Sequence, residues 1–311
     1  CHKGILASPR IGVNTGSVHS ALPGYRSYLV SDLHGDVARY RALFRLLRDE
    51  PPDLLLMAGD LLPHPFRSLD SLGVSGVDFV NDYLIREFGA LRRELGDTLP
   101  LVYLILGNDD PRFEEASVMS AAEPKVWSYI HNRRVRLGEY LLFGYAFIPP
   151  TPFRNKDWER YDVSRFVDPG CISPEEGSRS VPVSPRELRH RTISEDLARL
   201  TGEEELERAL FLFHVPPYGT SLDRADLEGQ RVDHVPVDPH VGSIAVRRLI
   251  EERQPHLTLH GHVHEAFRLT GSFKEEIGRT WCISAAHEGP ELVVVDFDLR
   301  DPGSAERRVI P

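Results

Sequence analysis

The sequence predicts an α/β protein whose main sheet is parallel. In the first third of the chain, short and fully apolar segments alternate with segments of helical periodicity. This pattern is typical of parallel strands that are buried on both faces and joined by helices. In the last third, strand-like segments follow one another without helices between them, which predicts a second sheet of mostly antiparallel strands. A chain of 311 residues is long for one domain, but α/β domains with insertions reach this size.

The first strand and helix follow a segment without periodicity. Residues 1–24 contain Gly, Pro and Ser and are predicted to be a tail, so the domain is expected over residues 25–311. Residues 28–30 predict a buried strand, Asp36 is a suitable N-cap for the next helix, and Pro51 ends that helix. The side of this helix that faces the core is predicted to carry Val37, Tyr40, Phe44 and Leu47. Its outer side is predicted to carry Arg39, Arg41, Arg45 and Arg48.

The next elements repeat this alternation. Residues 54–57 predict a second strand, which Ala-Gly-Asp ends, and residues from about 77 to 95 predict a helix. Residues 101–106 predict a third strand, which ends in Gly-Asn-Asp-Asp. Three fully apolar strands with helices between them favour parallel order.

The periodicity disappears from residue 149 to about residue 191, where Pro, Gly and Ser are frequent. A stretch of this length without regular structure is usually a functional lid or disordered. We therefore predict a lid-like insertion at about 149–209. Near its end, Thr192 and Glu195 have the spacing of a capping box that opens a helix.

The remaining elements lead to a motif rich in histidine. Residues 210–215 predict a buried strand that includes His214, and residues 243–252 predict a helix. Residues 257–259 predict another strand, which is followed by His-Gly-His-Val-His. The strands expected after this motif cover 266–269, 280–284 and 292–297.

Composition and charge exclude several classes of protein. The net charge is −10 and the pI about 5.8, so nucleic acid is a disfavoured partner. No apolar run approaches the ~18 residues that a membrane span needs. Three cysteines without a C-x-x-C pair suggest reduced thiols and a cytoplasmic location. A chain that starts at Cys1 would also suit an acylated lipoprotein, although no signal segment is visible.

Polar residues gather where the predicted strands end. In an open parallel sheet, ligands bind beyond the carboxyl ends of the strands. Taken singly, Asp32, Asp60 and Asn108 suit turns or caps, His214 suits a core position, and one His-x-His is a weak signal. Seven oxygen and nitrogen ligands that each end a buried strand are a stronger signal: Asp32, His34, Asp60, Asn108, His214, His262 and His264.

These residues resemble the motifs of the calcineurin-like metallophosphoesterases. The family pattern is D-x-H, G-D, G-N-H-D/E, H and G-H-x-H, and it is matched in order from residue 32 to residue 264. The resemblance implies a four-layer α/β/β/α sandwich, in which two mixed sheets pack face to face and helices flank them. It also implies that Asp32, His34 and His264 hold one metal ion. Asn108, His214 and His262 would hold a second ion, and Asp60 would bridge both.

The ligand types agree with two divalent ions such as Mn, Fe or Zn, between which the sequence does not choose. Two ions about 3.5–4 Å apart can share a hydroxide and clamp phosphate oxygens. His260 matches no ligand position, so a packing or supporting role is expected for it.

One position departs from the family. The resemblance implies that positions 109 and 110, here Asp109 and Asp110, form the catalytic pair. In the family the first position is usually a histidine that acts as an acid toward the leaving group, and the carboxylate at the second position orients it. Asp110 matches this pattern, whereas Asp109 replaces the histidine.

The predicted function is hydrolysis of a phosphodiester, phosphoanhydride or phosphomonoester by attack of a metal-bridging hydroxide. The expected partner is a small phosphorylated substrate, with nucleotides among the candidates, and the oligomeric state stays open. The alternative, kept open by Asp109, is a catalytically weak metal-site scaffold that binds partner proteins. Within the insertion, Lys156, Trp158, Arg160 and Tyr161 are candidates for substrate contact, although a Trp more often anchors a loop.

Overall fold

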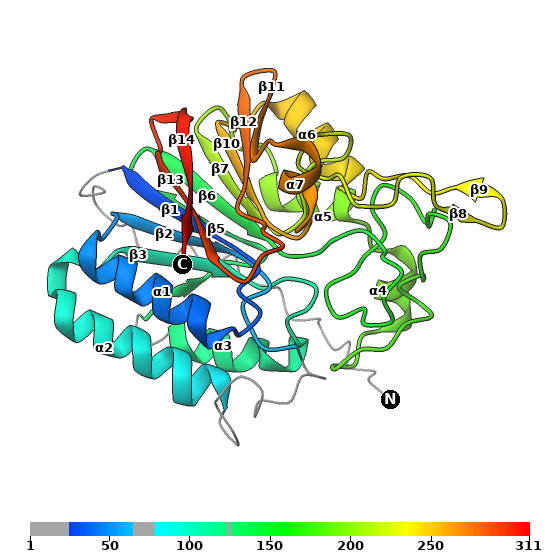
Figure 1. Cartoon of the computed structure of the whole chain (residues 1–311). Helices are drawn as coiled ribbons and strands as arrows, with labels where there is room; N and C mark the ends of the chain where they lie inside the picture. Colours follow the sequence, from blue (N-terminus) through cyan, green and yellow to red (C-terminus); the bar gives the residue numbers. More distant parts are fainter. Residues whose placement is uncertain (1–24, 65–77, 123–125) are drawn as a thin grey trace, which may run out of the picture.

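The computed structural model describes residues 25–64, 78–122 and 126–311. The predicted tail at 1–24 lies outside these ranges. Two six-stranded sheets pack face to face, with helices on their outer sides (Figure 1). This is the predicted α/β/β/α arrangement of two mixed sheets. No helix in the described ranges is long and apolar enough to pass through a bilayer.

The first sheet contains the three strands predicted in the first third of the chain. Its order is β14-β13-β1-β2-β3-β4, and β1 to β4 are parallel while β13 and β14 run antiparallel to their neighbours. The bounds are β1 Arg26–Val30, β2 Leu54–Ala58, β3 Leu101–Ile105, β4 Ser128–Tyr129, β13 Leu292–Asp298 and β14 Asp301–Ile310. All five residues of β2 are buried, as expected for a central strand with both faces covered.

The second sheet has the order β11-β12-β10-β7-β6-β5. Its four central strands, β12, β10, β7 and β6, are parallel, and only the two edge strands pair antiparallel. The bounds are β5 Arg133–Leu137, β6 Tyr140–Tyr145, β7 Ala209–Phe213, β10 Leu257–His260, β11 Lys274–Ile277 and β12 Thr280–Ser284. Strands β2 and β3 pack against β6 and β7, so the centres of the two sheets form the core.

Helices cover the outer faces. On the side of the first sheet lie α1 Val37–Asp49, the π-helical turn η2 Phe79–Leu84 with α2 Ile85–Leu95, and α3 Glu115–Ala122 (Figure 1). On the side of the second sheet lie α5 Ile193–Thr201 and α6 Ile244–Arg253, which contact each other. The short elements are η3 Gly96–Thr98, η4 Arg112–Glu114, α4 Pro185–His190, α7 Ala266–Thr270 and the hairpin of β8 Arg231–Val232 and β9 Val235–Pro236.

Two predicted helix starts are confirmed in atomic detail. The Asp36 carboxylate accepts hydrogen bonds from the backbone amides of Ala38 and Arg39, as an N-cap does. Thr192 accepts from the amide of Glu195 at the start of α5. The helix predicted from about residue 77 is present from Phe79, and residue 77 itself lies outside the described ranges.

Two predictions for the last third are wrong. Residues 266–269 belong to helix α7, not to a strand, because Gly271 takes a left-handed conformation (φ 73°) that closes a short helical turn. The strands after the histidine motif do not form a separate antiparallel sheet. Strands β13 and β14 extend the first sheet beside β1, whereas β11 and β12 extend the second. Sheet membership depends on pairing between distant segments, which a local pattern does not encode.

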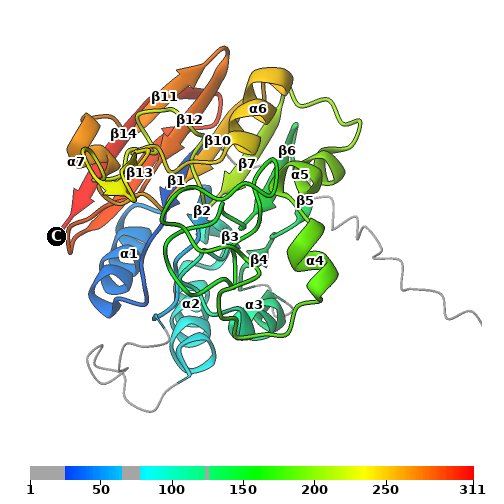
Figure 2. The same cartoon turned by 90° about the vertical axis from the view of Figure 1, so that its right-hand side faces the viewer.

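The insertion is folded rather than without structure. Lys156, Trp158 and Arg160 are buried, and Asp162 accepts hydrogen bonds from the amides of Ile244 and Ala245 at the start of α6. In Figure 2 the segment, drawn in green, lies on the side of the molecule toward which β1, β2 and β3 end. The insertion is therefore part of the surroundings of the strand ends.

Candidate metal centre

Polar side chains from both sheets meet at the carboxyl ends of five strands. Asp32 and His34 follow β1, Asp60 follows β2, and Asn108 follows β3. From the second sheet, His214 follows β7, and His262 and His264 follow β10. Two groups have ligand atoms close enough to hold a metal ion: Asp32, His34, Asp60 and His264, and Asp60, His214 and His262. Asp60 belongs to both groups, which is the arrangement expected of a bridging carboxylate.

The first group is centred on Asp32. Its carboxylate is almost fully buried and accepts hydrogen bonds from the backbone amide of His262 at 3.0 and 3.2 Å. The His264 Nε2 lies 3.3 Å from Asp32 Oδ1 and 3.2 Å from His34 Nε2. Two imidazole nitrogens and a carboxylate thus face one point.

The second group is centred on His214. Its Nδ1 lies 2.7 Å from the backbone oxygen of Ala58, so this nitrogen carries the proton and donates. Its Nε2 lies 2.9 Å from Asn108 Oδ1 and 3.3 Å from Asp60 Oδ2. The remaining member, His262, has its ring centroid 5.0 Å from that of His214.

The backbone is strained where the side chains converge. Four of the eight described non-glycine residues with positive φ are predicted ligands: Asp32, His34, Asp60 and His262. Such conformations cost free energy and cluster at functional sites. Close approach also explains one glycine of the motifs, because a Cβ at Gly107 would lie 2.3 Å from Asp60 Oδ1.

The buried carboxylates of Asp32 and Asp60 favour positive charge beside them. Burial opposes ionisation of Asp32, yet His264 and the other histidines outweigh it and hold the pKa of that carboxyl below its usual value. Burial lowers the pKa of His214, but the Asp60 carboxylate more than compensates and raises it to about 10. For His264, Asp32 likewise raises the pKa to about 9 against the effect of burial. Burial and the neighbouring His214 lower the pKa of His262 to about 3.

The donor set fits divalent metal ions. With Nδ1 donating to Ala58, the Nε2 of His214 faces the oxygens of Asn108 and Asp60. Since the pKa of His214 is raised to about 10, Nε2 carries a proton when no metal is bound, and a divalent ion would bind in exchange for that proton. A histidine that donates its other nitrogen to a backbone carbonyl is the usual arrangement of a metal ligand. Imidazole, carboxylate and amide oxygen are also the ligands that Mn, Fe and Zn accept.

Asp109 and Asp110 point in different directions. Asp109 Oδ2 lies 3.7 Å from His34 Nδ1, and the side chain is 33% exposed at the edge of the cluster. Its backbone amide donates to Asp60 Oδ1 at 2.8 Å. Asp110 is fully buried and accepts from the amides of Leu62 and Gly107 at 2.6 and 2.8 Å. Because Leu62 and Gly107 lie on the loops after β2 and β3, Asp110 connects two loops that carry predicted ligands. No described hydrogen bond joins the carboxylates of Asp109 and Asp110.

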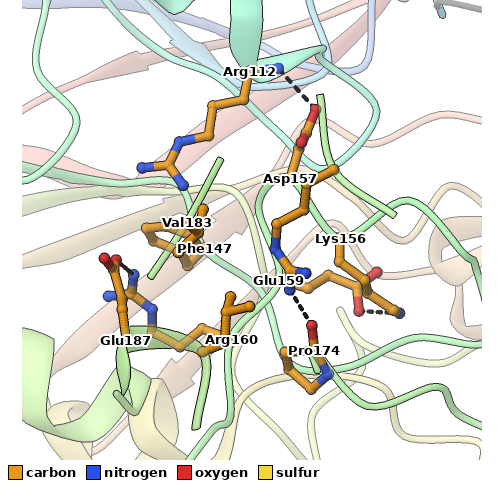
Figure 3. Close-up of a pocket in the computed structure, with 11 residues that line it drawn as sticks. Arg112, Phe147, Lys156, Asp157, Glu159, Arg160, Pro174, Val183 and Glu187 are labelled. Carbon is orange, nitrogen blue, oxygen red and sulfur yellow. Dashed lines mark hydrogen bonds and ion pairs between the residues drawn. The ribbon is translucent and has the colours of Figure 1, made fainter. Parts of the chain in front are cut away.

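The four residues of the insertion predicted as candidates for substrate contact make contacts within the protein. Trp158 is fully buried and donates from Nε1 to the backbone oxygen of Asp110 at 2.8 Å, so it anchors the loop. Lys156 is buried against Glu159, and Arg160 is paired with Glu187 (Figure 3). Tyr161 is buried and donates to Glu175 at 3.0 Å. The polar groups of these four residues are engaged within the insertion and its neighbours.

Two residues near the site were not recognised from the sequence. Asn155 donates from Nδ2 to the backbone oxygen of Asn108 at 3.1 Å, and no local pattern marks it. Arg39, which the helical pattern placed on the outer side of α1, donates to the backbone oxygens of Asp32 and Gly289. Its position in the first turn after D-L-H-G-D was the only available signal. His260 is buried between Val215 O and Thr258 Oγ1, as expected for a packing role.

Comparisons with known proteins concern the family and the fold. The model of the calcineurin-like phosphoesterase family matches residues 25–266. The solved structure of TT1561 of Thermus thermophilus superposes with a TM-score of 0.53 at 17% identity, covering 93% of this chain and all of the other. A second solved structure superposes over the same shares with a TM-score of 0.56 at 16% identity. At these identities the superpositions support the fold alone. None of the curated protein sequences compared matches this chain.

Proposed function

Because the chain belongs to the calcineurin-like phosphoesterase family, we propose that it hydrolyses phosphoric esters or anhydrides with the help of two divalent metal ions. The observation that carries this proposal is the convergence of six further ligand-type side chains from both sheets around Asp60. Asp32, His34 and His264 would hold one ion, and Asn108, His214 and His262 the other. When bound, the two ions would supply a nucleophilic hydroxide near neutral pH and positive charge for the phosphate oxygens.

The chain's own residues orient this centre. The Ala58 carbonyl fixes the tautomer of His214, and the amide of Asp109 fixes one oxygen of Asp60. The amide of His262 fixes the carboxylate of Asp32. Hydrogen bonds of this kind keep ligand atoms aimed at one point, so less reorganisation is needed when an ion or a substrate binds.

The rival function is a metal-site scaffold with weak or no catalysis. The observation that favours it is Asp109, which puts a carboxylate where the family has its acid. The intact ligand cluster favours the enzyme, because all seven ligand-type side chains of the family pattern are retained. We propose a small phosphorylated molecule as substrate.

The two functions are separated by measuring metal content and turnover on the same preparation. The enzyme is expected to bind two equivalents of Mn and to hydrolyse bis(p-nitrophenyl) phosphate in a Mn-dependent manner. Two bound equivalents without turnover of this or any other phosphoric ester would support the scaffold. Failure to bind metal at all would contradict both.

A further inference from the structure

A hollow of about 260 Å³ adjoins the candidate metal centre on the side of α7. Figure 2 places α7 and α4 on opposite sides of the strand ends, so this hollow and the insertion flank the site from different directions. The hollow is lined by His264, Phe267, Arg268, His287, Glu288 and Gly289. His264 also lies 3.3 Å from Asp32 within the ligand cluster. A molecule in the hollow therefore touches the same imidazole that faces the metal site.

Three of the six lining residues, His264, Phe267 and His287, carry flat rings. The guanidinium of Arg307 lies 4.0 Å from the centroid of the Phe267 ring. Phe267 lines the hollow and Arg307 does not, so a group in the hollow can contact Phe267 beside this cation–π pair. An aromatic ring flanked in this way presents a face or edge on which a second planar group can pack.

The polar groups around the hollow are already paired. Arg268 pairs with Glu288 at 2.7 Å and with Asp226 at 3.0 Å, so its guanidinium is engaged at the rim. His287 has Nε2 3.2 Å from Glu291 and accepts at Nδ1 from Arg307 at 3.1 Å, so neither of its nitrogens is free to bind a ligand. The hollow thus offers ring surface rather than charge, and it suits a flat apolar group.

The wall is fixed relative to the metal cluster. Arg39 donates to the backbone oxygens of both Asp32 and Gly289, and also to Pro290 O at 3.3 Å. One guanidinium therefore ties the loop that carries a predicted ligand to the loop that lines the hollow. A bound group held by this wall would keep a constant position relative to the phosphate site.

We infer that this hollow binds a planar aromatic group of the substrate, such as an aryl ring or a nucleobase, with Phe267 as its stacking partner. The inference rests on the proposed function, because it assumes that the substrate's phosphate lies at the metal cluster beside His264. It narrows the substrate class to phosphoric esters or anhydrides that carry a flat ring near the phosphorus.

The test compares phosphonates whose C–P bond cannot be hydrolysed by this chemistry, so that binding is measured without turnover. Binding of phenylphosphonate, cyclohexylphosphonate and methylphosphonate to the Mn-loaded full chain is measured by calorimetry. Phenylphosphonate is expected to bind about tenfold more tightly than methylphosphonate, the size of effect that stacking on one aromatic side chain has elsewhere. Cyclohexylphosphonate should bind less tightly than phenylphosphonate, because it buries apolar surface but cannot stack.

Variants assign the effect to Phe267. In Phe267→Leu the ratio of the methylphosphonate to the phenylphosphonate Kd should fall to about two or less, whereas Phe267→Tyr should keep it. Leu269→Ala, two residues further along α7 and outside the lining, is the matched control and should also keep it.

The proposal is overturned if wild type does not distinguish the phenyl from the methyl compound, or if Phe267→Leu retains the preference. It is also overturned if the cyclohexyl compound binds as tightly as phenyl, or if no phosphonate binds. A preference for the phenyl compound without turnover of any ester would contradict the proposed function. It would still support the hollow as a binding site for an aromatic ring.

Discussion

His214 Nε2 lies 2.9 Å from Asn108 Oδ1, although the two residues follow strands of different sheets. His214 leaves β7 in the second sheet, and Asn108 leaves β3 in the first. Asp60, from the first sheet, lies 3.3 Å from the same nitrogen. An ion held here would connect the two sheets, so metal binding and stability are expected to be coupled.

Removal of metal should lower the melting temperature. An ion present at 100 times its Kd stabilises the folded state by about 2.7 kcal/mol, which corresponds to a shift of a few degrees for a domain of this size. The measurement is thermal unfolding of the chain with EDTA and with excess Mn. In His214→Ala the shift should shrink, since one ligand of the shared site is lost. Identical melting curves in EDTA and in Mn would contradict a metal between the sheets.

Replacing Asp60 should disable both half-sites together. Asp60→Asn keeps the shape of the side chain but removes the charge that two cations would share, so we expect loss of at least one bound metal and of most activity. Metal content by elemental analysis and turnover of bis(p-nitrophenyl) phosphate are the measurements. Asp298→Asn, a change of the same type in β13 at a surface ion pair, should alter neither. Full activity with two metals retained in Asp60→Asn would refute the bridging role.

The insertion should support the metal site through Asn155. Its side chain holds the backbone oxygen of Asn108 at 3.1 Å, and loss of such a supporting contact typically weakens metal affinity about 10- to 100-fold. We therefore expect Asn155→Ala to weaken the second Mn equivalent by about tenfold in a titration. Phe153→Ala, two residues away at a 61% exposed side chain, serves as the control. Equal Mn affinity in both variants would show that the insertion does not support the ligands.

The ligand cluster could be predicted from the sequence because each member directly follows an apolar strand, and the ends of parallel strands meet at one edge. Taken singly, Asp32 and Asp60 suited turns or caps and His214 a core position, so their prediction as ligands also depended on the order of motifs that resembles the family. The sheet partners of β13 and the contacts of Arg39 could not be predicted in this way. Arg39 lies on the polar side of an amphipathic helix, and its role depends on Gly289, which the chain brings back after 250 positions.

Helix α7 was missed for a different reason. Residues 266–269 alternate too briefly to separate a strand from one helical turn. The helix ends at Gly271, which has a left-handed conformation. A glycine indicates a helix end only when the residues before it are already known to be helical. Because Phe267 lies on α7, its position beside the hollow could not be predicted from the sequence either.

Stability should fall in acid through Asp196. This carboxylate is 3% exposed and accepts hydrogen bonds from Tyr145, Arg160, Arg191 and Arg199. Burial acts to raise its pKa, but Arg160 and Arg191 outweigh burial and hold the pKa below its usual value. A carboxyl with a depressed folded-state pKa stabilises the protein above the unfolded pKa, near 4, and that contribution is lost as the pH falls through the folded value.

The matching experiment is unfolding of Asp196→Asn at pH 7 and at pH 3. Because three guanidinium groups lose their shared anion, we expect a loss of about 3–5 kcal/mol at pH 7, and a smaller difference from wild type at pH 3. Glu207→Gln, at an exposed pair with Arg279, should cost less than about 1 kcal/mol. A constant difference for Asp196→Asn across the pH range would contradict this account.

The last prediction is that Asp109 is not the general acid, so that the enzyme prefers good leaving groups. Burial and the Asp60 carboxylate raise the pKa of Asp109. Two bound dications would act in the opposite direction and at close range, because Asp109 lies 3.7 Å from His34 of the ligand cluster. We expect the cations to prevail, which leaves Asp109 ionised near neutral pH.

An ionised Asp109 cannot protonate a leaving alkoxide, and such assistance is commonly worth ~10²–10⁴ in rate. Aryl esters and anhydrides should therefore react fast and alkyl esters slowly, and the added negative charge should disfavour dianionic monoesters relative to diesters. The measurement is kcat/KM for aryl diesters of graded leaving-group pKa, in wild type and in Asp109→His. We expect a steep dependence in wild type and a shallower one with histidine, which can donate a proton. A shallow dependence in wild type, together with collapse of activity in Asp109→Asn, would instead identify Asp109 as the proton donor, because only a protonated carboxyl could then account for both results.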